Sequence, residues 1–255
     1  MLRDGERGRR ARKVGPLNRS IFIGWDPREA AAYAVARASV QRHLSREIPV
    51  NGLVLDDLIE RGLYARPMTR PQVGNRQIMW DVISDAPMST EHACARFLTP
   101  HLAKTGWALF MDGDMLCRSD LNELFDNLDP SKAVYCVKHR HEPEPGVKMD
   151  DQIQTRYARK NWSSVIVFQC EHPANKALTM DLINKAPGRD LHRLCWLEDA
   201  DIGELGPEWN YLVGHTPPNV DPKLVHFTLG TPDMPGYEDQ PYVETWREEL
   251  RRWAA

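Results

Sequence analysis

The feature that most constrains the fold is the segment 107–111 (WALFM), five apolar residues that lead directly into Asp112-Gly113-Asp114. A strand that is apolar at consecutive positions is buried on both faces, unlike the alternating strand of a half-exposed sheet. Burying both faces of a sheet requires a layer of helices on each side. The segment therefore predicts an α/β fold.

The rest of the chain alternates strand-like and helix-like segments. Apolar, β-branched runs predict further strands at 20–25, 50–55, 133–137, 164–169 and 224–227. Helices are predicted at 30–43, 90–102, 120–126, 173–184 and 242–253. Before the first helix, Asp26 is a predicted N-cap, Pro27 suits the first helical position, and Glu29 is a capping-box partner. The alternation predicts a Rossmann-like, mostly parallel sheet with helices on both faces.

Length and charge bound the organisation of the chain. With 255 residues it can form one substantial core, so we expect a single domain over 20–255. Residues 1–19 hold seven basic side chains against two acidic ones and lack an apolar period, which predicts a disordered basic arm. This arm is either a solvated tail or a peripheral contact with an anionic lipid surface. The formal net charge of −3 gives no reason to expect nucleic acid as a partner.

Membrane and redox signals favour a cytoplasmic protein. The sequence has no run of about 18 apolar residues that could form a transmembrane helix. The basic N-terminus is not followed by the hydrophobic stretch of a signal peptide. The five cysteines are widely spaced and lack a Cys-x-x-Cys pair, which is typical of reduced thiols.

The Asp112-Gly113-Asp114 turn is the main candidate for chemistry. Two carboxylates two residues apart at a strand's carboxyl end can bind one divalent cation, and the glycine between them allows a diphosphate to approach the backbone. Open α/β sheets bind ligands at this edge. Asp-Gly-Asp is also common turn chemistry, but apolar residues on both sides of the motif favour a functional site.

At this point the sequence resembles the retaining glycosyltransferases of family 8, which include glycogenin and the bacterial lipopolysaccharide galactosyl- and glucosyltransferases. The resemblance covers most of residues 20–232. The matching segments, in the family's order, are 21–26 (IFIGWD), 93–97 (ACARF), 109–114 (LFMDGD) with 120–125 (DLNELF) after it, and 224–230 (LVHFTLG). This resemblance implies a GT-A fold and transfer of a hexosyl group from a nucleotide-sugar donor, UDP-sugar, to a carbohydrate, lipid-linked or other hydroxyl acceptor.

The resemblance also implies a set of site residues. The metal ligands would be Asp112, Asp114 and His226, holding Mn²⁺ or Mg²⁺. The nucleotide would be bound by Ile23, Gly24, Trp25, Asp26, Arg96, Asp112 and Gly113. The substrate contacts would be Gln152, Trp162, Ser163, Ser164, Glu198 and Gly230. The family's Asp-Gln pair corresponds to Asp199 by its distance past Ser164, with Asp151 as the alternative catalytic residue.

Two departures from the family pattern bear on the donor. The family's diphosphate-binding lysine after the closing histidine is absent, so Arg96 or Arg76 would have to serve. The family's Asn-Ala-Gly strand opening is replaced by 161–164 (NWSS), which leaves the transferred sugar open.

Three other classes of protein remain as alternatives. A phosphatase of the haloacid dehalogenase type also has an apolar strand before Asp-x-Asp, but near its N-terminus and with Thr or Val where Met115 stands. A sugar nucleotidyltransferase needs a Gly-rich loop after the first strand, which residues 24–28 do not form. A sugar-binding or scaffold protein on a degenerate transferase fold is the non-enzymatic alternative. If the chain is a transferase, we expect the polar, proline-containing loop of residues 139–152 to form part of the acceptor site.

Overall fold

The structure is a computed structural model of the chain, and it describes residues 18–254 apart from residue 75 and the segments 140–158 and 160–161. The predicted arm up to residue 17 and most of the predicted acceptor loop, with Asp151 and Gln152, lie outside the described residues. Arg19, assigned to the arm from the sequence, instead opens the first strand, and its guanidinium donates to Asn122.

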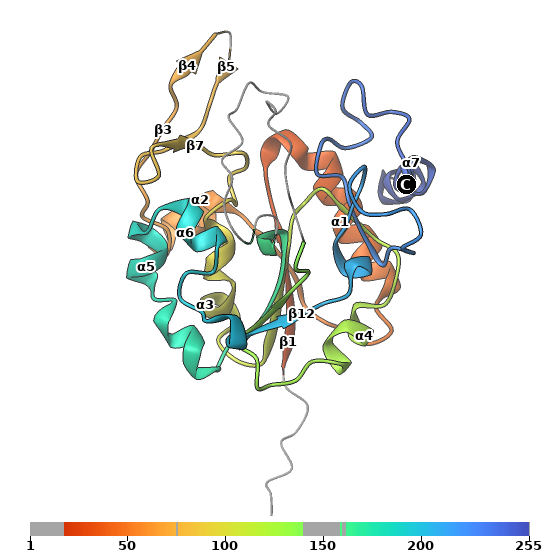
Figure 1. The fold of residues 1–255 in the computed structure, drawn as a ribbon. Helices are drawn as coiled ribbons and strands as arrows, with labels where there is room; N and C mark the ends of the chain where they lie inside the picture. The colour runs from red at the N-terminus through yellow and green to blue at the C-terminus, as the bar shows by residue number, and fades with distance from the viewer. Residues whose placement is uncertain (1–17, 75, 140–158, 160–161, 255) are drawn as a thin grey trace, which may run out of the picture.

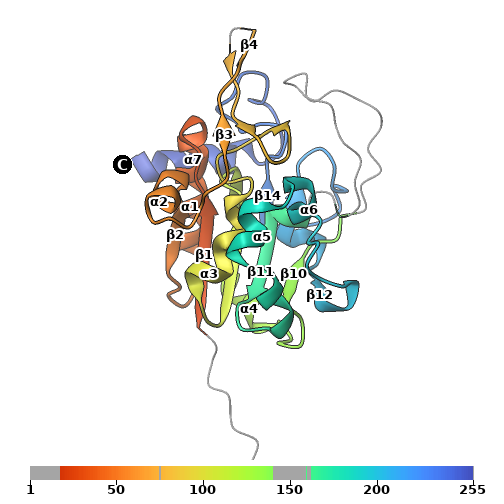
Figure 2. The same ribbon diagram turned by 90° about the vertical axis from the view of Figure 1, so that its left-hand side faces the viewer.

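A six-stranded sheet forms the centre of the molecule (Figures 1 and 2). Its order is β12 (Ile202–Glu204), β10 (Val134–Cys136), β11 (Val165–Gln169), β8 (Trp107–Met111), β1 (Arg19–Gly24) and β2 (Val50–Leu53). Strand β11 runs antiparallel to β8 and β10, and the other neighbouring pairs are parallel. The predicted mostly parallel α/β sheet is therefore confirmed.

Helices cover both faces of this sheet, as predicted (Figure 1). One face packs against α2 (Leu55–Glu60), α3 (Thr99–Ala103), α5 (Met180–Lys185) and α6 (Gly188–His192). The other packs against α1 (Ala30–His43) and α4 (Leu121–Asp126), and α7 (Val243–Ala254) lies on α1. All five residues of β8 are buried, as a strand between two helical layers requires.

Smaller sheets extend from this core. A three-stranded sheet, β13 (Tyr211–Leu212), β14 (Leu224–His226) and β9 (Met115–Cys117), continues directly from the Asp-Gly-Asp turn. A second one, β3 (Met68–Thr69), β6 (Trp80–Asp81) and β7 (Ala86–Pro87), carries the hairpin β4 (Gln72–Val73) and β5 (Arg76–Gln77), which projects from the body in Figures 1 and 2. Of these short strands, only β14 was predicted from the sequence, as the strand at 224–227.

Two helices predicted as continuous are interrupted. The helix predicted at 90–102 is a turn, a 3₁₀ helix (Ala95–Leu98) and then α3. Pro100 has no N–H to donate to the carbonyl of Arg96, and the Thr99 hydroxyl bonds that carbonyl instead. The helix predicted at 173–184 is a 3₁₀ helix (Pro173–Ala177) followed by α5, where the Thr179 side chain accepts from Leu182 N as an N-cap.

Candidate metal and nucleotide site

The Asp-Gly-Asp turn lies at the carboxyl edge of the main sheet, directly after β8. Asp112 N donates to Ser164 O at 3.0 Å, which joins the turn to the start of β11. A Cβ atom on Gly113 would lie 2.4 Å from Gly24 O, so only glycine allows the turn to lie this close to the end of β1. The side chains of Asp112 and Asp114 are 15% and 20% exposed, which leaves both partly accessible to a ligand.

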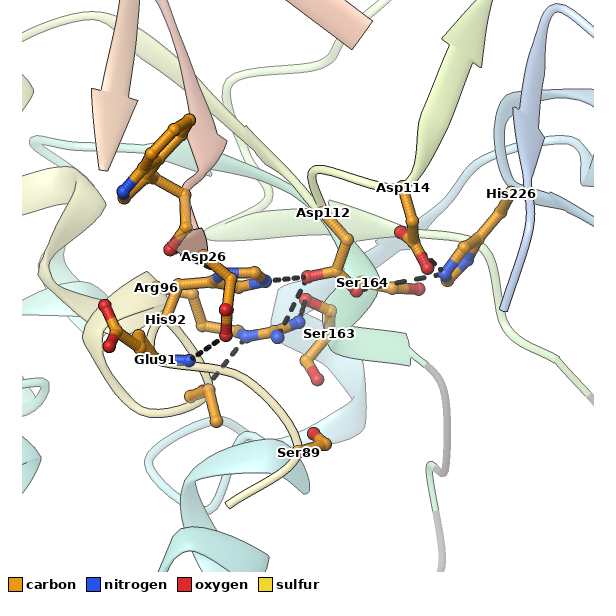
Figure 3. Close-up of polar contacts among 12 residues, drawn as sticks. Asp26, Ser89, Glu91, His92, Arg96, Asp112, Asp114, Ser163, Ser164 and His226 are labelled. Atoms are coloured by element: carbon orange, nitrogen blue, oxygen red, sulfur yellow. Dashed lines mark hydrogen bonds and ion pairs between the residues drawn. The ribbon is translucent and has the colours of Figure 1, made fainter. Parts of the chain in front are cut away.

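His226 reaches the two aspartates from a distant part of the chain. It ends β14, which pairs antiparallel with β9, and Phe227 N donates to Asp114 O at 3.1 Å. His226 Nε2 lies 3.3 Å from Asp114 Oδ1 and 4.0 Å from Asp112 Oδ2 (Figure 3). One potential ligand atom from each of the three residues lies within 4.8 Å of the other two. The three residues predicted as metal ligands are thus brought together.

Asn210 orients the histidine. Its Nδ2 donates to Ser164 Oγ at 2.8 Å, so its Oδ1 faces the imidazole and lies 3.0 Å from His226 Nδ1. An amide oxygen only accepts, so Nδ1 carries the proton and the Nε2 lone pair of the neutral ring points at the aspartates. This outer contact is the kind that fixes the tautomer of a metal-binding histidine.

Arg96 and His92 hold Asp112. Its Oδ1 lies 2.9 Å from Arg96 Nη2 and 3.2 Å from His92 Nε2, and both of these side chains are buried (Figure 3). Burial alone raises the pKa of Asp112, but Arg96, and then His92 and His226, outweigh burial and hold the pKa well below its usual value. Asp112 is therefore ionised across the physiological pH range.

The cluster fits a divalent cation. Oδ1 of Asp112 and Oδ1 of Asp114 are buried and have no partner in hydrogen-bond geometry among the described residues, although Arg96 and His226 lie within ion-pair distance. Burial lowers the pKa of His226, but Asp114 and Asp112 together raise it by more, so the net shift is upward. Two carboxylates and one imidazole are a donor set suited to Mn²⁺ or Mg²⁺. A bound cation would be coordinated by the two unpartnered carboxylate oxygens and by the imidazole.

The four residues predicted to bind the nucleotide at the end of β1 differ in how far their side chains are exposed. The side chain of Ile23 belongs to the core, and Gly24 has no room for a side chain because a Cβ atom would lie 2.5 Å from the His92 ring. The buried Asp26 carboxylate accepts from Arg28 N and Glu91 N, which confirms its role as a cap. Of the four predicted residues, only Trp25 has a partly exposed side chain, and its ring packs edge-on against Tyr33 at 4.9 Å.

Ser163 and Ser164 lie beside Asp112, at the start of β11. Ser163 O accepts from Arg96 Nη1 at 2.8 Å, and Ser163 Oγ lies 2.6 Å from His192 Nδ1. Trp162 lies one residue further out, with Lys138 and Arg159 each 5.8 Å from its ring centre. Ser163 and Ser164 therefore border the candidate metal cluster, whereas no described contact places Trp162 against it.

Gly230 is not placed against the aspartates by any described contact. A Cβ atom there would lie 2.6 Å from the Tyr237 ring, and its carbonyl accepts from Gln240 at 2.8 Å. Its role in binding stays a prediction.

Asp199 lies at the opposite edge of the sheet from Asp112. Ile202 is level with Val134, Phe168 and Ala108, close to the start of β8, and Asp199 precedes Ile202 in the chain. Its side chain is 85% exposed and pairs with Arg159 at 2.5 Å, and the neighbouring Glu198 is also exposed. The catalytic and substrate roles of Asp199 and Glu198 stay predictions, and the strand register disfavours them.

Four residues of the site were missed from the sequence: His92, Asn210, His192 and Glu29 as a site residue. Burial first, and then Asp114, Asp26 and Asp112, raise the pKa of Glu29 to about 8, which places its carboxyl group in the field of the cluster. His92 stands four residues before Arg96, on the same short segment, which is the one local signal that could have found it. The other three lie on separate elements and carried no such signal.

Comparison with solved structures defines the class of fold. The chain is similar to the galactosyltransferase LgtC in complex with donor and acceptor sugar analogs, at 15% identity and a TM-score of 0.57 over 91% of this chain and 95% of that one. It is also similar to the bifunctional glycosyltransferase WbbM, at 17% identity and a TM-score of 0.58 over 93% of this chain, and to the glycosyltransferase GlyE of Streptococcus pneumoniae, at 15% and 0.58. The chain spans half the length of WbbM and 62% of GlyE. The protein has the GT-A fold of glycosyltransferases.

The family follows from a closer relative. Protein CDI of Arabidopsis thaliana is 38% identical to this chain over 239 residues, which cover 91% of this chain and 86% of the relative. This chain therefore belongs to the Protein CDI family. No protein-family model matches the sequence. Among the described residues, no helix is both long and apolar enough to cross a bilayer.

Proposed function

We propose that this protein is a metal-dependent glycosyltransferase that transfers a hexosyl group from a UDP-sugar to a hydroxyl acceptor with retention of configuration. The observation that carries the proposal is the cluster of Asp112, Asp114 and His226 at the carboxyl edge of a GT-A sheet. Retention, the hexosyl group and membership of glycosyltransferase family 8 rest on the sequence resemblance. A cytoplasmic location and a lipid contact of the arm likewise stay proposals.

The order of the strands supports a direction for the donor. Strands β1, β8 and β11 are neighbours in that order, and their site-facing ends carry Trp25, the Asp-Gly-Asp turn and Ser163. A nucleotide-sugar whose base lies at β1 and whose diphosphate lies at β8 would place its sugar over the start of β11. Ligands that bind across the carboxyl edge of an α/β sheet are oriented in this way.

The site must stabilise the nucleoside diphosphate that leaves during transfer. Negative charge grows on the leaving group as the glycosidic bond breaks, and stabilising it lowers the barrier. A divalent cation held by Asp112, Asp114 and His226 supplies that electrostatic stabilisation. Arg96 and His92 hold Asp112 in place, and Asn210 holds His226.

The diphosphate lysine of the resembled family has a candidate replacement in Arg96. Its Nη2 lies 2.9 Å from Asp112, which brings a permanent positive charge to the cluster. The guanidinium is already engaged by Ala93 O and Ser163 O, so it acts through its field more than through a free N–H. The side chain of Arg76, the other candidate, lies outside the described part of the structure.

Metal-dependent hydrolysis of UDP-sugars tests the proposal without knowledge of the acceptor. The wild-type protein is expected to release sugar slowly from at least one UDP-hexose with Mn²⁺ and not with EDTA, and Asp112→Asn to abolish the release. Asp221→Asn is the matched control, because the Asp221 side chain is 95% exposed and pairs only with Arg118 among the described residues. UDP binding without any hydrolysis would favour a binding module, and release of phosphate from phosphate monoesters would favour a phosphatase.

A further inference from the structure

His192 is a histidine of the site that neither the sequence resemblance nor the metal cluster explains. It ends α6 and is half-buried, and its Nδ1 lies 2.6 Å from Ser163 Oγ. Its other ring nitrogen, Nε2, has no hydrogen-bond partner among the described residues. A polar ring with one satisfied and one unsatisfied nitrogen can bind a further hydrogen-bonding group.

The position of the imidazole ring is fixed from two sides. Phe97 packs edge-on against it with the ring centres 5.4 Å apart, and Ser163 holds Nδ1. Phe97 follows Arg96 in the chain, so the residue that pairs with Asp112 and the residue that packs on His192 share one short 3₁₀ helix. The ring is thereby placed relative to the metal cluster.

Helix α6 is itself anchored by a buried ion pair. Arg66 pairs with Asp81 at 2.5 Å, and both side chains are buried. Arg66 Nη1 donates to Ala186 O at 2.7 Å, and Gly188 N donates to Ser84 Oγ at 2.8 Å. Breaking such a pair by removing one partner is strongly destabilising, so these contacts anchor the start of the helix that carries His192 to a stable part of the fold.

The imidazole is neutral at physiological pH. Burial lowers the pKa of His192 to about 3, and Arg96 contributes to the lowering. A neutral imidazole offers one N–H and one lone pair, and the Ser163 hydroxyl can complement either. The pair therefore suits a hydroxyl group, which also donates and accepts, more than an anion.

We propose that Ser163 and His192 bind a hydroxyl group of the transferred sugar and contribute to the selectivity of the enzyme among UDP-sugars. This inference rests on the proposed function, which places the sugar over the start of β11. Ser163 connects the pair to the metal cluster, because its carbonyl and Asp112 are held by the same Arg96 guanidinium. A site built to hydrogen-bond a substrate hydroxyl discriminates against a sugar that lacks it or presents it on the other face.

The test compares the affinity of UDP with that of UDP-glucose, UDP-galactose, UDP-N-acetylglucosamine and UDP-xylose, all with Mn²⁺, by calorimetry. His192→Phe keeps the packing against Phe97 and removes the hydrogen bond. We expect it to bind UDP within about twofold of wild type and to lose about three- to tenfold of the affinity that the preferred sugar adds, the value of one hydrogen bond. His192→Gln, which keeps a hydrogen-bonding group, is expected to recover part of this loss, and Ser163→Ala to show an intermediate loss.

His101→Phe is the matched control. His101 is also half-buried with a single hydrogen bond, to Leu178 O at 2.6 Å, and it lies on α3. The His101→Phe variant should change neither the affinity for UDP nor the affinity for the UDP-sugars. The inference is overturned if His192→Phe leaves the difference in affinity between UDP and the preferred UDP-sugar unchanged. It is also overturned if the wild-type protein binds every UDP-sugar with the same affinity as UDP. In both cases the proposed metal and nucleotide site stands. If UDP itself fails to bind with Mn²⁺, the proposed function is wrong.

Discussion

Two segments of the molecule have the pattern Asp-x-Asp, and they are built in opposite ways. Asp112-Gly113-Asp114 follows β8 at the carboxyl edge of the sheet, and Asp199-Ala200-Asp201 precedes β12 near the amino edge. Asp112 lies among Arg96, His92 and His226, whereas Asp199 is 85% exposed and pairs with Arg159.

The difference shows what an Asp-x-Asp segment needs, besides its spacing, to become a candidate metal site. The spacing in the sequence is the same, but other elements bring buried side chains to the first segment, whereas Asp199 in the second stays exposed and pairs with Arg159. Strand β14 brings His226, and the 3₁₀ helix before α3 brings Arg96. An exposed ion pair such as that of Asp199 contributes roughly 0–1 kcal/mol to stability and needs no ligand.

The largest effect, and so the strongest test of this comparison, is expected from Asp114→Ala. It removes a proposed metal ligand, and the electrostatic contribution of a metal is worth several kcal/mol at the transition state. We expect a loss of roughly 1000-fold or more in Mn²⁺-dependent sugar release, with the thermal midpoint in EDTA little changed. Near-normal turnover of the variant in Mn²⁺ would contradict the metal assignment.

A smaller effect is expected from Asn210→Leu, which removes an outer contact of the cluster and no ligand. Without the amide oxygen, His226 loses the acceptor that keeps its proton on Nδ1. The affinity for Mn²⁺ should fall by about 10- to 100-fold. Titration of the apoprotein with Mn²⁺, monitored by electron paramagnetic resonance of the free ion, measures this directly. An unchanged affinity would show that Asn210 only packs.

The variant Glu29→Gln sharpens the comparison through pH. The pKa of Glu29 is raised from its ordinary value of 4.5 to about 8 in the folded protein, so between these values the folded state binds more protons than the unfolded state. The stability of the metal-free wild type should therefore fall as the pH rises from about 4.5 to 8, relative to the variant. Below this window the two proteins should melt together, and at pH 8 the variant should melt higher by on the order of a few degrees.

Adding Mn²⁺ should shrink the difference caused by Glu29→Gln, because a cation relieves the repulsion between Glu29 and the aspartates. Glu60→Gln on the exposed end of α2 serves as the control. A difference in melting temperature that is the same at pH 5 and pH 8 would show that the carboxyl group of Glu29 does not feel the cluster.

The smallest effect is expected from Asp199→Asn, on the segment at the amino edge. Because this carboxylate is exposed and remote from Asp112 by the strand register, turnover should stay within about threefold of wild type. Donor hydrolysis and nucleotide affinity both measure it. A loss comparable to that of Asp114→Ala would instead support the catalytic role that the family resemblance assigns to Asp199.

The sequence by itself determined the sheet and the position of the candidate cation site. Strand β8 and the Asp-Gly-Asp turn could be predicted because burial on both faces leaves a continuous apolar run, which is a local signal. Helix α1 was predicted with both of its ends, and Asp26 caps the 3₁₀ helix Pro27–Glu29 that leads into it, so the signals lie within one stretch of chain. His226 was predicted through the family resemblance.

Tertiary structure alone decided what surrounds those residues. Asn210, His192 and Glu29 lie on three different elements and meet the site only when the sheet and its loops are packed. Their hydrogen bonds and electrostatic fields depend on distances of a few ångströms between residues far apart in the chain, and such distances leave no periodic pattern in a sequence. The same is true of Asp199, whose spacing is that of a ligand pair but whose position at the amino edge is set by the register of β12 with β10.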